Sequence, residues 1–159
     1  MGTHKERFKV VPAVYVIFQR EGKVLLLKRA NTGYMDGLYS LPAGHVDGDE
    51  PAVLAAVREA QEEVAVTLTR DSLRLAHVMH RQADPSDRDG KHERVDLYFK
   101  VDTWPSEPVN NEPHKCSELR WVVIGDLPEN MVPEVKVVLE KVVAGEVYSD
   151  YNFPGLSDL

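Results

Sequence analysis

The segment from Pro51 to Val64 constrains the chain more than any other, because its charged and apolar residues repeat at helical spacing. An α-helix advances about 100° per residue, so residues three and four apart share a face. The residues expected on the buried face are Val53, Leu54, Val57, Ala60 and Val64. Those expected to cluster on the opposite face are Glu59, Glu62 and Glu63. Pro51 suits a first helical turn, where Asp49 or Glu50 is expected to cap the free amides.

Three carboxylates this close on a helix repel one another, by about 0.2–0.5 kcal/mol per pair in an isolated helix. Arg58 lies one turn before Glu62 and offsets part of this repulsion, but one cation does not neutralise three anions. A hard cation such as Mg²⁺ does, because it prefers carboxylate oxygens and keeps water ligands that leave room for phosphate oxygens and a nucleophile. The alternative is an ordinary solvated helix face, which is the usual origin of an acidic cluster.

The wider segment resembles the Nudix box, which runs Gly, five residues, Glu, seven residues, then Arg-Glu-apolar-any-Glu-Glu-any-Gly-apolar. The residues at its specific positions are Gly44, Glu50, Arg58, Glu59, Glu62 and Glu63. Ala60 and Val66 fill the apolar positions, and residues 41–44 resemble the family's turn into the box. The one departure is Ala65, which stands where the family has the Gly that usually ends the helix. The chain is thereby identified as similar to MutT-like Nudix hydrolases.

The resemblance implies an α/β fold, a Nudix-type α/β/α sandwich around a mixed β-sheet. It also implies cleavage of a phosphoanhydride bond in a nucleoside diphosphate linked to another group. By resemblance, the metal ligands are the Gly44 carbonyl and the carboxylates of Glu59, Glu62 and Glu63, and the cation is Mg²⁺, with Mn²⁺ as the alternative. Arg58 would orient these carboxylates, and Glu50 would brace the loop against the helix.

The catalytic residues that the resemblance implies are Glu59, Glu62, Arg58 and Glu112. The base is either a box glutamate or a carboxylate from a later loop, for which Glu112 is the candidate; its alternative interpretation is an ordinary exposed loop acid. Arg29 and His45 are candidates for substrate binding. Arg29 is equally explained as a solvated strand end, and His45 occupies a variable position of the box.

Three hypotheses about function follow. The leading one is a nucleoside triphosphate pyrophosphohydrolase, which produces a monophosphate and pyrophosphate. The second is an ADP-ribose or nucleotide-sugar pyrophosphatase, a branch that resembles sequences with a proline soon after the box, whereas here Pro85 comes late. The third is a Nudix-like binding or regulatory module without catalysis. The intact glutamates, the net charge of −7 and the lack of a second domain argue against this third hypothesis.

Outside the box, alternation and turn signals define the remaining elements. Strands are expected at Val10–Phe18, Lys23–Leu27, Leu38–Leu41, Leu73–Arg81, Arg94–Val101 and Leu119–Ile124. Glu21 and Gly22 predict a hairpin between the first two. In Arg94–Val101, apolar and polar residues alternate, which is typical of a half-buried strand. Polar loops are expected at Ala83–Lys91 and Pro105–Cys116, and a helix at Val135–Val143 with Gly145 at its end.

The 159 residues are expected to form a single domain, 1–159, in which segments 1–8 and 150–159 are less ordered than the rest. A net charge of −7 argues against binding to nucleic-acid polymers or membranes, both of which need a basic surface. Cys116 is the single cysteine, which excludes an intramolecular disulfide and a multi-cysteine zinc site. No apolar stretch approaches about 18 residues, so we expect a cytoplasmic protein with a nucleotide substrate and, by resemblance, a homodimer.

Overall fold

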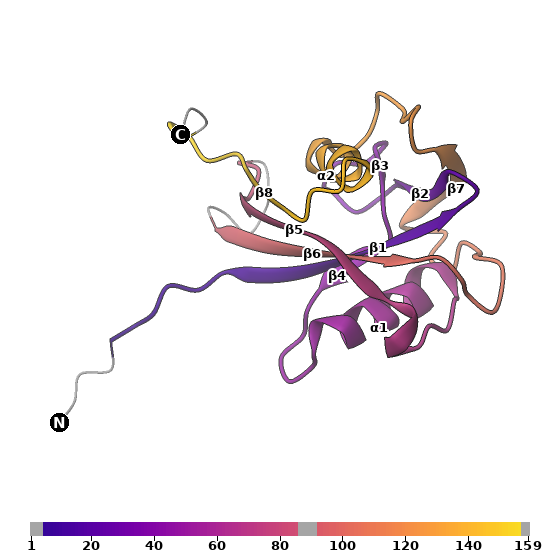
Figure 1. The fold of residues 1–159 in the computed structure, drawn as a ribbon, viewed down its shortest axis with the longest axis horizontal. Helices are drawn as coiled ribbons and strands as arrows, with labels where there is room; N and C mark the ends of the chain where they lie inside the picture. The colour runs from indigo at the N-terminus through magenta and orange to yellow at the C-terminus, as the bar shows by residue number, and fades with distance from the viewer. Residues whose placement is uncertain (1–4, 86–91, 157–159) are drawn as a thin grey trace.

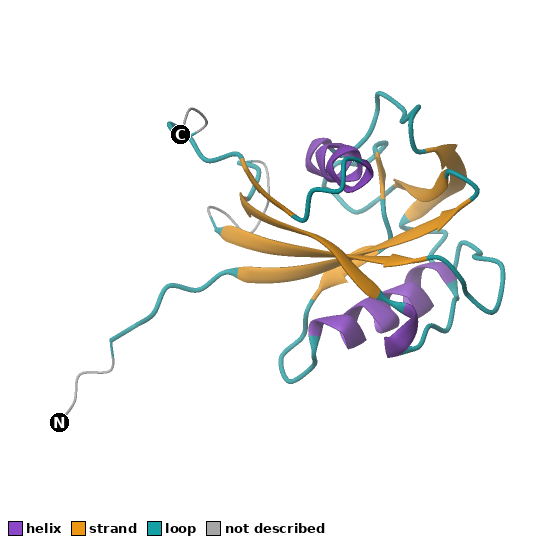
Figure 2. Cartoon of the chain, in the orientation of Figure 1, coloured by secondary structure: helices purple, strands orange, loops and turns teal. Residues whose placement is uncertain are grey.

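The computed structural model describes residues 5–85 and 92–156. The strands are β1 (Val11–Arg20), β2 (Lys23–Arg29), β3 (Tyr39–Ser40), β4 (Ala43–His45), β5 (Arg74–Gln82), β6 (Glu93–Val101), β7 (Cys116–Val123) and β8 (Tyr148–Tyr151). The helices are α1 (Ala52–Val64) and α2 (Pro133–Val143), with a 3₁₀ turn η1 at Arg70–Ser72. The two α-helices lie on opposite sides of the sheet (Figure 1), which gives the three layers seen in Figure 2. The predicted α/β/α sandwich around a mixed sheet is confirmed.

The sheet has the strand order β3-β2-β1-β6-β5-β8, with β4 paired to β1 and β7 paired to β2. β1 runs parallel to β6 and β5 runs parallel to β8, while the other pairs are antiparallel. β1 is buried on both faces: Val14 and Phe18 belong to the core on the α1 side, whereas Tyr15 and Ile17 belong to the core on the α2 side. Burial on both faces explains why β1 is an apolar run rather than an alternating one.

The predicted N-terminal hairpin is confirmed, with Glu21 and Gly22 at its tip. Both residues have a positive φ, 49° and 71°. Two successive residues with positive φ form the turn whose twist suits adjoining antiparallel strands, and glycine adopts this conformation without strain.

The buried face of α1 differs from the predicted one. Its buried residues are Ala55, Ala56, Glu59, Ala60 and Val64, whereas Leu54 is 41% exposed. The face that meets the sheet is centred on Ala56 and Ala60, and Leu54, about 200° around the helix from Ala56, lies away from it. Glu59 therefore lies on the sheet side of α1, and the prediction that it shares a face opposite the core with Glu62 is wrong.

The start of α1 also differs from the prediction. Pro51 is the N-cap residue, and no side chain caps the helix, so the expected cap by Asp49 or Glu50 is wrong. Glu50 instead accepts a hydrogen bond from the backbone N–H of Asp47 at 2.8 Å and forms an ion pair with Arg58 at 2.7 Å. These contacts hold the loop before α1 against the helix.

At its other end, α1 stops at Val64, and Ala65 takes the left-handed conformation with φ of 56°. The left-handed conformation costs an L-residue roughly 1–2 kcal/mol in the folded state, and glycine adopts it without this cost. Glycine also raises the entropy of the unfolded chain, which stabilises the unfolded state by about 0.4–1 kcal/mol. We therefore expect Ala65→Gly to raise the free energy of unfolding by about 0.5–1 kcal/mol, measured by denaturant unfolding.

Ala144, which follows α2 with φ of −75°, provides the matched control. Glycine relieves no strain at this position, so Ala144→Gly is expected to lower the free energy of unfolding by about 0.4–1 kcal/mol. A loss of stability in Ala65→Gly comparable to that in Ala144→Gly would contradict the account of the end of α1.

β6 confirms the predicted strand, but the burial of its two faces is unexpected. The polar residues Arg94, Asp96 and Tyr98 are buried, at 8%, 0% and 0% exposure. Alternation predicts a strand but does not show which face is covered, and here the polar face, which includes Tyr98, packs into the core on the α2 side of the sheet. Charged side chains are therefore placed inside the fold.

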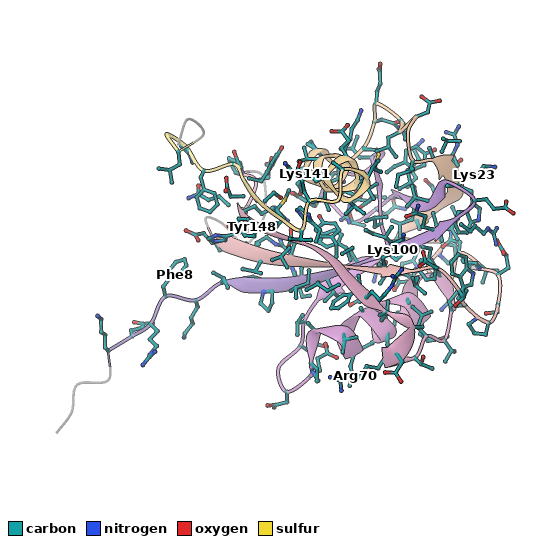
Figure 3. All side chains as sticks on the ribbon, viewed as in Figure 1. Phe8, Lys23, Arg70, Lys100, Lys141 and Tyr148 are labelled. Carbon is teal, nitrogen blue, oxygen red and sulfur yellow. The ribbon has the colours of Figure 1, made fainter. Side chains whose placement is uncertain are left out.

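The remaining differences lie in short or terminal elements. β4 and β8 were not predicted, because three or four residues are too few for an alternation signal. The polar loop expected at Ala83–Lys91 falls partly in residues 86–91, outside the described residues. The extended segment before β1, which carries Phe8, runs away from both helices (Figure 3). None of the helices in the described ranges is long and apolar enough to cross a membrane.

Candidate active site

Four carboxylates and two cations line one cavity of about 280 Å³ beside the second half of α1. The acidic residues are Glu59, Glu62, Glu63 and Glu112, and the basic ones are Arg29 and Lys115. α1 contributes three of the glutamates, β2 ends with Arg29, and the loop before β7 contributes Glu112 and Lys115. The structure thus brings together residues that the sequence separates by more than 80 positions.

Glu59 is held against the backbone of Gly44. A Cβ atom at position 44 would lie 1.9 Å from Oε1 of Glu59, so any side chain larger than hydrogen would displace this carboxylate. Arg58 Nη1 donates a hydrogen bond to the same Oε1 at 2.7 Å. Burial raises the pKa of Glu59, because it disfavours the charged form, and Arg58 opposes this effect. Glycine is therefore required at position 44, because the Glu59 carboxylate occupies the space that a side chain would fill.

Glu63 reaches the loop before α1, where its Oε2 accepts a hydrogen bond from the backbone N–H of Ala43 at 2.8 Å. Burial raises the pKa of Glu63 to about 8, and the charges of Glu59 and Glu112 act in the same direction. Glu62 is the exposed member of the group, with its side chain 51% accessible and 3.5 Å from Arg58. Three carboxyl groups of one helix therefore line this cavity.

Arg58 connects the helix to the loop before it. Its guanidinium pairs with Glu50 at 2.7 Å and with Glu59 at 2.7 Å, and it donates to the carbonyl oxygen of His45 at 3.1 Å. The hydrogen bond to Glu50 lowers the pKa of that carboxyl. These contacts match the orienting role expected for Arg58 and the bracing role expected for Glu50.

The loop that carries Glu112 is fastened to the last turn of α1. The backbone N–H of Asn111 donates to the carbonyl of Glu63 at 3.1 Å, and its side-chain Nδ2 donates to the carbonyl of Glu62 at 3.0 Å. Glu112 then pairs with Lys115 at 3.1 Å. Sequence reasoning missed the roles of Asn111 and Lys115, because the contacts of Asn111 join segments about 50 residues apart and leave no local sequence signal.

The residues of this cavity fit a divalent cation by their ligand chemistry. Carboxylate oxygens are the donors that Mg²⁺ and Mn²⁺ prefer, and the close contact between Gly44 and Glu59 leaves no room for a competing side chain. In the described part of the chain, no three acidic, His or Cys side chains already converge as a ligand set. Glu59 faces Arg58 and Glu63 faces Ala43, so binding an ion requires these carboxylates to turn into the cavity.

Arg29 and His45, the two candidates for substrate binding, lie on the wall of a second cavity. Arg29 lines both cavities and donates to the carbonyl oxygen of Tyr34 at 2.8 Å and to Oγ1 of Thr32 at 3.0 Å. Nε2 of His45 lies 2.6 Å from Nη2 of Arg94. The structure therefore separates His45 from the carboxylate cavity and places Arg29 between the two.

Comparison with family models matches residues 8–142 to the NUDIX domain. Among curated proteins, the isopentenyl-diphosphate Delta-isomerase of Ruegeria pomeroyi is 31% identical over 136 residues, which cover 80% of this chain and 74% of that protein. The ADP-ribose pyrophosphatase of Methanocaldococcus jannaschii is 28% identical over 136 residues, 84% of this chain and 75% of that protein.

Among solved structures, the MutT NUDIX hydrolase from Burkholderia pseudomallei is similar, with a TM-score of 0.74 and 28% identity. The match covers 84% of this chain and 98% of that one. The family match runs from the segment before β1 into α2, so it includes the acidic helix and both cavities.

Proposed function

The chain belongs to the NUDIX domain family and is a hydrolase of phosphoanhydride bonds, and we propose that its reaction is the Mg²⁺-dependent hydrolysis of a nucleoside triphosphate to a monophosphate and pyrophosphate. The observation that carries this proposal is the single cavity lined by Glu59, Glu62, Glu63 and Glu112. Both curated relatives are named for substrates that contain a diphosphate, which is the group that such a cavity suits.

The acidic residues of the cavity suit metal binding and water activation, and its basic residues suit phosphate binding. A bound divalent cation neutralises phosphate oxygens and lowers the pKa of a coordinated water. Glu59, Glu62 and Glu63 are the residues that would hold it. Arg29 and Lys115 lie on the same wall and stabilise the negative charge of the phosphate chain through charge-assisted hydrogen bonds.

We assign the role of general base to Glu112. Its side chain is 23% exposed on the cavity wall, so it reaches solvent water as well as the substrate. Its Oε1 pairs with Lys115 at 3.1 Å, while Glu59 and Glu63 are assigned to the metal. Asn111 fixes the position of Glu112 because it ties the loop to the carbonyl groups of Glu62 and Glu63.

ADP-ribose is the second candidate substrate. The carboxylate cavity adjoins the second cavity through Arg29 and Ala43, which leaves space for a group beyond a diphosphate. The Methanocaldococcus jannaschii relative, which matches over most of both chains, is named for this substrate.

A panel of nucleoside triphosphates and ADP-ribose at equal Mg²⁺ concentration tests the assignment. We expect at least one triphosphate to have a higher kcat/KM than ADP-ribose, with pyrophosphate and not orthophosphate as the first product. Pyrophosphate forms because the α–β anhydride bond breaks: water attack at the α phosphorus expels pyrophosphate, and attack at the β phosphorus expels the monophosphate and leaves pyrophosphate behind. If ADP-ribose is favoured by tenfold or more, about 1.4 kcal/mol of transition-state preference, the triphosphate assignment is wrong and the family assignment stands.

A further inference from the structure

The loop between β2 and β3, residues 30–38, closes on Arg29 at the edge of the carboxylate cavity. The backbone N–H of Gly37 donates to the carbonyl oxygen of Arg29 at 2.7 Å, and the N–H of Arg29 donates to the carbonyl oxygen of Leu38 at 3.0 Å. The loop residues with a positive φ are Asn31, Gly33, Met35 and Gly37. Residues other than glycine keep such a conformation only where surrounding contacts fix it, so this loop needs contacts that hold its shape.

Asp36 supplies such contacts. Its Oδ1 accepts hydrogen bonds from the backbone N–H of Thr32 at 3.0 Å and from the Thr32 hydroxyl at 2.5 Å, and its Oδ2 accepts from the N–H of Gly33 at 2.9 Å. These hydrogen bonds, above all that from the hydroxyl, lower the pKa of Asp36 because they stabilise its charged form. Asp36 is exposed and lines neither of the two cavities. Its carboxylate therefore acts on the loop and not directly on a ligand.

Thr32 connects Asp36 to Arg29. A hydroxyl group has one hydrogen to donate and lone pairs that accept. The charged carboxylate of Asp36 is a stronger acceptor than the carbonyl oxygen of Tyr34 and lies nearer to Oγ1 of Thr32, at 2.5 Å against 2.9 Å, so it takes the hydroxyl hydrogen. The lone pairs of Oγ1 then face Nη2 of Arg29, which donates to it at 3.0 Å. Nε of Arg29 donates to the carbonyl oxygen of Tyr34 at 2.8 Å, so the loop fixes the guanidinium through both nitrogens.

The fixed guanidinium keeps hydrogen-bond donors for a ligand. Within residues 5–85 and 92–156, Nη1 of Arg29 donates no hydrogen bond, so its N–H groups remain available. Arg29 and Thr32 line the carboxylate cavity together, and the positive charge of Arg29 acts to lower the pKa of Glu63 in the same cavity. An anionic phosphate group in this cavity can therefore accept from Nη1 while the loop holds Nε and Nη2.

We propose that Asp36 is a positioning residue for a bound diphosphate: acting through Thr32, it holds the Arg29 guanidinium in the orientation in which Nη1 binds a phosphate oxygen. The proposal rests on the phosphate-binding role of Arg29 in the proposed function. A carboxylate that only closed the loop would need the backbone N–H groups of Thr32 and Gly33 alone. The hydrogen bond from the hydroxyl is the one that reaches Arg29. An arginine that is fixed before the ligand arrives loses less side-chain freedom on binding.

Equilibrium binding of inorganic pyrophosphate with Mg²⁺, measured by titration calorimetry, tests this role without nucleotide turnover. Asp36→Asn keeps the size of the side chain, but its amide NH₂ group faces a donor, so at least one of the hydrogen bonds is lost. We expect Asp36→Asn to weaken pyrophosphate binding about tenfold and Arg29→Ala to weaken it about 30-fold. Asp126→Asn, at an exposed position in the turn after β7, is the matched control and should bind pyrophosphate as the wild-type protein does.

The double variant separates a positioning role from a purely structural one. If Asp36 acts through Arg29, adding Asp36→Asn to Arg29→Ala should weaken binding by less than about twofold further. A tenfold loss in both backgrounds overturns the proposal, as does unchanged binding in Asp36→Asn or no pyrophosphate binding by the wild-type protein. Denaturant unfolding is measured for each variant. Thr32→Val, which removes the connecting hydroxyl, should show the same tenfold loss, and it decides the outcome if Asp36→Asn fails to fold.

The probe also separates this proposal from the proposed function. Nucleoside triphosphates and ADP-ribose both contain a diphosphate, so the result does not depend on which of them is cleaved. Failure of the proposed function would appear as absent triphosphate turnover in wild-type protein that still binds pyrophosphate. Failure of the positioning role would appear as equal pyrophosphate binding by Asp36→Asn and the wild-type protein.

Discussion

Replacing Glu62 or Glu63 with glutamine is expected to lower kcat at least about 100-fold while the protein still folds. Glutamine keeps the shape of the side chain but removes one negative charge from the cavity that they share with Glu59. Glu62 is half exposed and has only a 3.5 Å contact with Arg58 to lose. The amide oxygen of Gln at position 63 can still accept the hydrogen bond from Ala43. Folding should therefore survive both changes.

The measurement is steady-state turnover of the best triphosphate, together with denaturant unfolding of each variant. Stability should remain near the wild-type value or rise slightly, because repulsion within α1 is relieved. Glu140→Gln removes a charge from an exposed position of α2 and should leave turnover unchanged. Near-normal turnover in Glu62→Gln and Glu63→Gln would contradict a metal-binding role for these two glutamates.

The acidic helix was predictable because its spacing is a local property. A helical repeat and the positions of Gly44 and Arg58 need no knowledge of the rest of the fold. Local spacing was a poor guide to burial: Glu59 lies against the sheet and Leu54 is exposed. That outcome depends on how closely α1 approaches β4, which is set by Gly44 and the helix alanines.

The residues that complete the site come from contacts between distant segments. Glu112 was a candidate by resemblance, but Asn111, which ties it to α1, was found only in the structure. The polar face of β6 gave a visible signal, since Arg94 and Asp96 alternate with apolar residues, yet alternation could not show that this face is buried.

Removal of divalent metal tests the central claim most directly, because Glu59, Glu62 and Glu63 are proposed to act only through a bound cation. Pyrophosphate release from a triphosphate is measured with Mg²⁺, after excess chelator, and after Mg²⁺ or Mn²⁺ is returned. The unfolding midpoint, measured in parallel, shows whether the metal-free protein remains folded.

The account predicts that turnover disappears in chelator and returns with either metal ion. Without a bound metal ion, the four carboxylates of the cavity repel a triphosphate. The fold should persist throughout, because both cores are built from apolar side chains and include none of the proposed metal ligands. Full turnover of folded protein in excess chelator would contradict the metal-dependent mechanism.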